Sequence, residues 1–135
     1  DLPVPRGGVA GGVVNGKFYV ANGQDETYEY IYVHEYDPVA NAWSEKAPSP
    51  DFFSFGAGVG TTDHLYIGGG YFGAGGGENQ FFEYDPVADE WTEKAPIPGG
   101  AGKKSPVMAP AAAERFVVMK ICEMARALSL PDAAS

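Results

Sequence analysis

The sequence has little cysteine, little positive charge and no long apolar run. Its single cysteine, Cys122, cannot form an intramolecular disulfide, so the fold does not depend on one. Lysine and arginine number 9 against 18 acidic residues, which gives a net charge of −9. Nucleic acids and anionic membranes are disfavoured as partners, because both are bound through basic side chains. No apolar run approaches the roughly 20 residues that cross a bilayer. We expect no nucleic-acid and no membrane partner, and the composition leaves the cellular compartment undetermined.

Glycine is absent from the C-terminal part of the chain. All 19 glycines lie at or before Gly102, whereas residues 103–135 are rich in alanine. We therefore divide the chain into residues 1–100 and 101–135. In the second segment, apolar residues recur every three or four positions from Val117 to Leu128, which predicts an amphipathic α-helix over about residues 110–128, after a linker. The simplest expectation is that this helix packs on the apolar surface of the domain.

Residues 1–100 contain one unit twice. The stretch from Tyr36 to Pro48 recurs from Tyr84 to Pro96, and the tryptophans are separated by 91 − 43 = 48 residues. Turn signals such as Asn15-Gly16 divide each copy into four short β-rich segments. The predicted strands are 8–14, 17–21, 30–36 and 42–46 in the first copy, and 54–60, 64–68, 80–84 and 90–94 in the second.

The repeated markers resemble the kelch repeat of β-propellers. They are Tyr36, Asp37, Pro38 and Trp43 in the first copy, and Gly68, Gly69, Tyr84, Asp85, Pro86 and Trp91 in the second. The first copy departs from the pattern, because Ala21-Asn22-Gly23 stands where a glycine pair is expected. The resemblance implies an all-β fold of two four-stranded antiparallel blades, at about residues 5–50 and 51–98. The two tryptophans are expected to fill the gaps between adjacent sheets.

Two blades do not close a propeller, which typically needs 4–8. Three explanations stay open: the chain is a fragment of a longer propeller, several chains assemble into one ring, or the C-terminal helix covers an open face. Of these, the fragment is the explanation that we favour.

The loops between second and third strands are expected to emerge on the same side as the connection between the two copies. The candidate ligand-binding residues on this loop face are Gln24, Asp25, Tyr28, Asp51, Phe52, Phe53, Tyr71, Phe72 and Asn79. Aromatic side chains beside acidic ones are typical of recognition surfaces, although these aromatics could equally cover blade edges. Since kelch propellers commonly bind partner proteins or small ligands here, the resemblance implies a binding module for a protein or carbohydrate.

The sequence offers no catalytic residue, metal site or cofactor. His34 and His64 lack the spaced partners of a metal set. Some kelch propellers are copper-radical oxidases, but Cys122 lies outside the repeat, so that activity is not carried over. We expect a non-catalytic module. The alternatives are a part of a sugar-acting propeller enzyme, of epimerase or oxidase type, whose catalytic residues lie on other blades, and a fragment without function.

Overall fold

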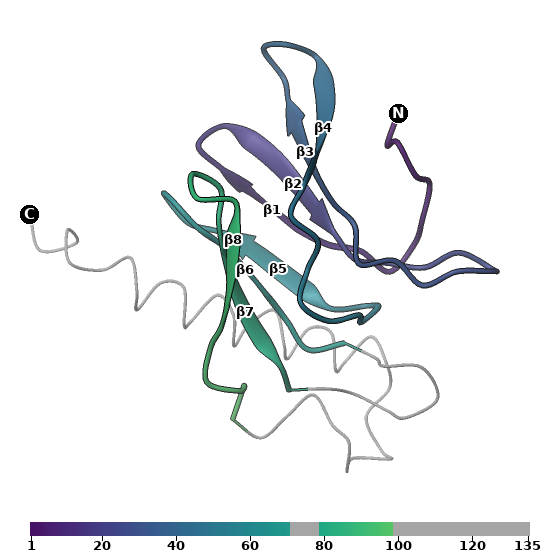
Figure 1. The fold of residues 1–135 in the computed structure, drawn as a ribbon, viewed down its shortest axis with the longest axis vertical. Coiled ribbons are helices and arrows are strands. Elements are labelled where there is room, and N and C mark those ends of the chain that lie inside the picture. Colours follow the sequence, from purple (N-terminus) through teal and green to yellow (C-terminus); the bar gives the residue numbers. More distant parts are fainter. Residues whose placement is uncertain (71–78, 99–135) are drawn as a thin grey trace, which may run out of the picture.

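The computed structural model describes residues 1–70 and 79–98, which form two four-stranded antiparallel sheets (Figure 1). In both sheets, each strand pairs with the next strand along the chain. Sheet 1 contains β1 (Ala10–Val14), β2 (Lys17–Ala21), β3 (Val33–Asp37) and β4 (Ala42–Lys46), and sheet 2 contains β5 (Ala57–Gly60), β6 (Leu65–Gly68), β7 (Phe81–Asp85) and β8 (Glu90–Glu93).

The predicted all-β architecture is confirmed. All eight expected strands are present, and the described residues contain no helix, so none that could cross a membrane. The predicted helix at about 110–128 lies outside the described residues.

The third-to-fourth strand turns of the two sheets are built alike. The Oδ1 atom of Asp37 accepts hydrogen bonds from the amides of Val39 (2.9 Å) and Ala40 (3.2 Å), and Asp85 does the same with Val87 and Ala88 at the same distances. An aspartate that bonds the backbone two and three residues ahead is the reason why Asp-Pro begins a tight turn.

The first strand of each sheet begins later than its sequence predicts. Gly8 has φ 64° and Phe55, the residue 55 − 8 = 47 positions later, has φ 57°. A left-handed residue interrupts the extended chain, so β1 starts at Ala10 and β5 at Ala57.

The main core lies between the two sheets. Alternate residues of a strand point to opposite faces, so each sheet has two faces. We call the face of sheet 1 that meets sheet 2 its back face, and the face of sheet 2 that meets sheet 1 its front face. The front face of sheet 1 and the back face of sheet 2 therefore point outward, away from the core between the sheets. The back face of sheet 1 contributes Tyr19, Ala21 and Val33 to this core, and the front face of sheet 2 contributes Leu65, Ile67, Phe82 and Tyr84.

Small residues bring the first strands of the two sheets together. A Cβ atom on Gly58 would lie 2.5 Å from the carbonyl oxygen of Gly11, and one on Gly12 would lie 2.5 Å from the amide nitrogen of Gly60. Contacts this short exclude any side chain, which explains why both first strands are rich in glycine.

The two tryptophans occupy different surroundings. Trp91 packs against the core between the sheets, as expected. Trp43, at the equivalent place in sheet 1, pairs with Tyr36, which in turn pairs with Phe18, on the face that points away from sheet 2. The prediction that both tryptophans fill a gap between sheets is therefore confirmed for Trp91 alone and stays a prediction for Trp43. The sheet that would cover Trp43 is not among the described residues.

Candidate functional site

A single carboxylate organises the loop between β2 and β3. Asp25 Oδ1 accepts hydrogen bonds from the amides of Thr27 and Tyr28, both at 2.7 Å, and its Oδ2 accepts the hydroxyl of Tyr30 at 2.6 Å. The Tyr30 hydrogen bond, together with those two amides, holds the pKa of Asp25 below its ordinary value. In turn, the hydrogen bond to Asp25 raises the pKa of Tyr30 to about 12. At neutral pH, the loop is therefore closed around a carboxylate.

The same loop is tied to the N-terminal segment. Gly7 and Gln24 exchange two backbone hydrogen bonds of 2.9 Å. The Arg6 guanidinium donates to the carbonyl oxygen of Asn22 at 2.6 Å. In Figure 1, the N-terminal segment and this loop lie on the same side of the molecule.

The connection between the sheets meets this loop, as predicted. Asn22 is fully buried and donates through Nδ2 to the carbonyl oxygen of Asp51 at 3.0 Å. Ser49 donates through Oγ to the side-chain oxygen of Asn22. Asp51 also accepts a hydrogen bond from Gln80 Nε2 at 2.8 Å, which links the connection to sheet 2. Loop and connection therefore form one continuous surface.

A row of aromatic rings leads from the loop onto the outward face of sheet 1. Tyr28, Tyr30, Tyr32 and His34 follow one another at every second residue, with ring centroids 6.3, 5.4 and 6.1 Å apart. The Trp43 ring lies 6.5 Å beyond His34. Residues two apart in an extended chain share a face, so the spacing of these residues builds the row.

An open groove of about 500 Å³ lies at the loop end of this row. Three of its large hydrophobic lining side chains are well exposed: Tyr28 at 63%, Ile31 at 39% and Tyr32 at 39%. Apolar rings that remain accessible beside backbone polar groups offer a surface for recognition. The groove is lined by Val4, Tyr28, Glu29, Tyr30, Ile31 and Tyr32.

The family comparison identifies the first sheet. The Kelch motif matches residues 5–50, which span all four strands of sheet 1 and its N-terminal segment. Residues 5–50 are therefore a kelch repeat, and we call sheets 1 and 2 together the kelch pair. Sheet 2 repeats the cross-strand pairing of sheet 1, since Tyr84 pairs with Trp91 in sheet 2 as Tyr36 pairs with Trp43 in sheet 1. No curated protein matches the chain.

The kelch pair brings together only some of the predicted site residues. Gln24, Asp25 and Tyr28 lie on the β2–β3 loop, and Asp51 contacts that loop through Asn22. Phe53 is fully buried in the core between the sheets and Phe52 is 8% exposed, so neither presents a free ring. Asn79 is exposed just before β7. Tyr71 and Phe72 lie outside the described residues.

The central residues of the groove were not predicted from the sequence. Tyr30, Ile31 and Tyr32 were expected to belong to the third strand, but that strand begins at Val33. The three tyrosines at positions 28, 30 and 32 were the available signal, because alternation places them on one face.

Neither histidine of the kelch pair forms a metal set. The described residues contain no group of three metal-ligating side chains. His34 is buried, and its Nδ1 faces the Arg6 guanidinium at 3.2 Å. His64 Nδ1 contacts Asp63 at 2.9 Å, near the turn into β6.

Proposed function

We propose that this kelch pair is a non-catalytic binding module whose β2–β3 loop groove takes a protein ligand. The kelch motif is of a protein-interaction type. The observation that carries the proposal is the exposed Tyr28, Ile31 and Tyr32 side chains of the groove. The loop that carries them is closed by hydrogen bonds that the Asp25 carboxylate accepts from the Tyr28 amide and the Tyr30 hydroxyl.

The form of the groove favours an extended peptide segment. Its rings follow an extended backbone and lie 5.4 to 6.3 Å apart, so every second side chain of an extended peptide can pack against successive rings. Glu29 lies in the groove, and Glu26 lies on the same loop. A ligand that combines apolar and basic side chains fits this surface.

The carbohydrate alternative rests on the same rings. Tyr30 and Tyr32 lie nearly parallel, with an interplanar angle of 24°, and flat aromatic surfaces also accept the apolar face of a sugar. Against this, the Asp25 carboxylate is already occupied by three hydrogen bonds, so it offers little to sugar hydroxyls.

Selection from a random 12-residue peptide library, run in parallel with a glycan array, tests the proposal. Peptides selected on the full chain should bind a Tyr28→Ser/Tyr32→Ser variant at least about tenfold more weakly, since aromatic anchors dominate such interfaces. Val39→Ser is the matched control, because Val39 is 96% exposed on the β3–β4 turn.

Unchanged peptide affinity in the double tyrosine variant would move the site away from the groove. Binding to glycans but not to peptides would replace the protein ligand with a carbohydrate.

A further inference from the structure

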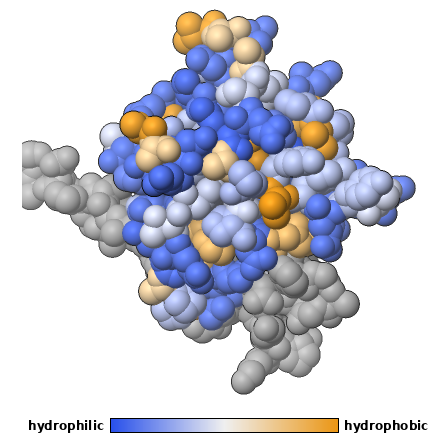
Figure 2. Space-filling view, viewed as in Figure 1, coloured by the Kyte–Doolittle hydropathy of each residue, from blue (hydrophilic) through white to orange (hydrophobic). Residues whose placement is uncertain are grey.

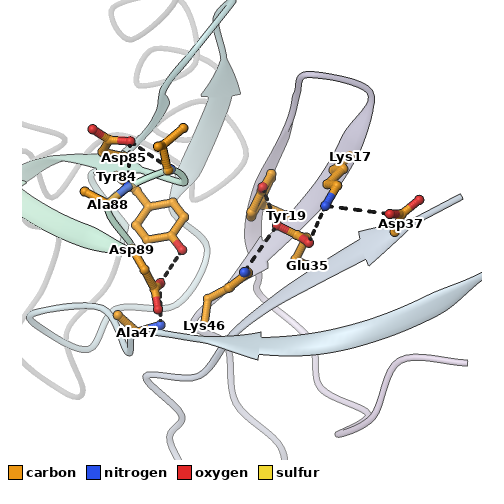
Figure 3. Close-up of polar contacts among 11 residues, drawn as sticks. Lys17, Tyr19, Glu35, Asp37, Lys46, Ala47, Tyr84, Asp85, Ala88 and Asp89 are labelled. Atoms are coloured by element: carbon orange, nitrogen blue, oxygen red, sulfur yellow. Dashed lines mark hydrogen bonds and ion pairs between the residues drawn. The ribbon is translucent and has the colours of Figure 1, made fainter. Parts of the chain in front are cut away.

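The interface between the two sheets is fixed at one backbone position of sheet 1. Trp91 Nε1 donates to the carbonyl oxygen of Ala47 at 3.0 Å. Asp89 Oδ1 accepts the Ala47 amide at 2.9 Å (Figure 3). Tyr84 donates its hydroxyl to Asp89, and its ring meets that of Tyr19 edge-on at 5.8 Å. Two side chains of sheet 2 therefore satisfy both polar groups of one residue that follows β4.

The groups that make this contact recur on the outward front face of sheet 1. Subtracting 48 from Tyr84, Asp89 and Trp91 leads to Tyr36, Asn41 and Trp43. Their geometry is the same. Tyr36 donates its hydroxyl to Asn41 Oδ1 at 2.7 Å, and Asn41 has φ 52° where Asp89 has φ 55°. Tyr36 and Trp43 have ring centroids 5.1 Å apart, against 4.8 Å for Tyr84 and Trp91. Sheet 1 thus carries the donor and acceptor arrangement that sheet 2 uses at Ala47.

The receiving residue recurs on the outward back face of sheet 2. Adding 48 to Ala47 leads to Ala95, which follows β8 and is exposed, whereas Ala47 is half-buried. Within the described residues, neither Ala95 nor the indole of Trp43 takes part in a hydrogen bond of this kind. The two halves of a second interface are therefore present at opposite ends of the kelch pair.

A charged network beside each alanine repeats as well. On the back face of sheet 1, Glu35 accepts the Tyr19 hydroxyl and lies 3.7 Å from Lys46 Nζ. On the back face of sheet 2, Glu83 accepts the Tyr66 hydroxyl and lies 3.2 Å from Lys94 Nζ.

Exposure distinguishes the two networks. The Glu35 and Lys46 side chains are 9% and 24% exposed, while those of Glu83 and Lys94 are 18% and 36% exposed. The outward copy of the network is thus the one that still reaches solvent.

The two outward faces match best at the last strand of each sheet, β4 in sheet 1 and β8 in sheet 2. Tyr66 is buried with Phe81 and Ile97, so the accessible part of the back face of sheet 2 is the edge formed by Lys94 and Ala95. On the front face of sheet 1, this edge would meet Tyr36 of β3, Trp43 of β4 and Asn41 in the turn between them.

We propose that the front face of sheet 1 docks on the back face of sheet 2 in a second copy of this chain. Trp43 Nε1 would donate to the carbonyl oxygen of Ala95, and Asn41 Oδ1 would accept the Ala95 amide. The two faces differ, so the association is head to tail, and it forms a ring when the rotation closes. Two, three or four copies give rings of four, six or eight blades, within the usual range.

Native mass spectrometry and sedimentation velocity of the full chain test the proposal. We expect one discrete species of two, three or four copies. Trp43→Ala and Ala95→Arg should each weaken the association at least about tenfold, since each removes one half of a buried contact. Val39→Ala and Val87→Arg are matched controls, because both valines lie on exposed turns outside the two faces.

Mixing the two interface variants gives the sharpest result. Trp43→Ala keeps the back face of sheet 2 intact, and Ala95→Arg keeps the front face of sheet 1 intact. An equal mixture should therefore form a dimer of one copy of each variant and nothing larger. Circular dichroism checks folding. Asn41→Gly provides a second front-face variant, because it removes the acceptor and tolerates the positive φ.

A folded wild-type chain that stays monomeric overturns the proposal. An oligomer that persists in Trp43→Ala, Asn41→Gly and Ala95→Arg alike also overturns it, because the association would then use another surface. Neither result bears on the peptide groove, which the Tyr28 and Tyr32 substitutions test separately.

Discussion

Two residues make the front face of sheet 1 unlike that of sheet 2. Arg6 stands where sheet 2 has the buried Phe53, since 53 − 6 = 47, and His34 stands where sheet 2 has Phe82, since 82 − 34 = 48. The guanidinium donates to the carbonyl oxygens of Asn22 and Tyr32 and to the ring of His34. The N-terminal segment therefore satisfies polar groups at one end of a face whose other end remains aromatic.

His34 should make stability depend on pH. A guanidinium only donates hydrogen bonds, so His34 Nδ1 must accept and the ring is neutral. Burial and the charge of Arg6 lower the pKa of His34 below its ordinary value. As the pH falls, His34 is protonated in the unfolded chain at a higher pH than in the folded chain. Its contribution to the free energy of unfolding is therefore complete above about pH 6.5 and is lost as the pH drops below that value.

Chemical denaturation at pH 7.5 and at pH 5.5 measures this effect. The difference in unfolding free energy between the two should be smaller in His34→Phe, which copies the residue of sheet 2. An equal pH dependence in the variant would show that the loss comes from other groups.

At the scale of elements, alternation and turn chemistry predict the strands well. The Asp-Pro turns and the Asn15-Gly16 hairpin fix where six of the strand ends fall to within a residue or two. The third strand of sheet 1 was predicted to begin at Tyr30, but it begins three residues later, at Val33. The reason is that two backbone groups before Val33 form hydrogen bonds with residues that do not belong to β2. Tyr30 donates its amide to Gly23, and the Ile31 carbonyl accepts from Ser49.

The candidate site was only partly predictable for a related reason. Alternation finds Tyr28 and its neighbours, but it does not say which aromatic rings become covered by the second sheet. Phe53 has the same sequence signature as an exposed loop aromatic, yet it fills the core between the sheets.

The approach of β1 to β5 should tolerate no side chain. Gly58→Ala places a Cβ atom against the backbone of Gly11 and should cost about 1–3 kcal/mol of unfolding free energy, as overpacking does. Gly7→Ala is the matched control, because nothing lies within 4 Å of a Cβ atom there and its φ is not positive. Its effect should stay within about 0.5 kcal/mol.

Urea denaturation of both glycine variants gives the comparison. Equal stability of Gly58→Ala and the native chain would mean that the two first strands can separate without loss, which would contradict an interface built on this contact.

The whole molecule combines a strong negative charge with two unlike outward faces. Figure 2 shows hydrophilic residues over most of the visible face, with hydrophobic residues in separate spots among them. A chain of net charge −9 repels its own copies at long range. Any self-association must therefore act through short contacts against a repulsive background.

Salt should strengthen head-to-tail association for this reason. Raising the ionic strength from about 0.01 M to about 0.15 M shortens the screening length from about 30 Å to about 8 Å and weakens the repulsion. Sedimentation velocity at the two salt concentrations should show a larger fraction of the oligomer in the higher salt. A smaller fraction would indicate that opposite charges across the interface, rather than the Trp43 and Ala95 contact, hold the copies together.

The unequal positions of the two tryptophans give the protein its own optical reporters. Trp91 is bonded inside the kelch pair, and Trp43 lies on the outward face. With only two indoles in the chain, a Trp43→Phe variant would report the integrity of a single molecule through Trp91 alone, and the difference from the native chain would report the surroundings of Trp43. Folding and assembly can therefore be watched separately, without a label.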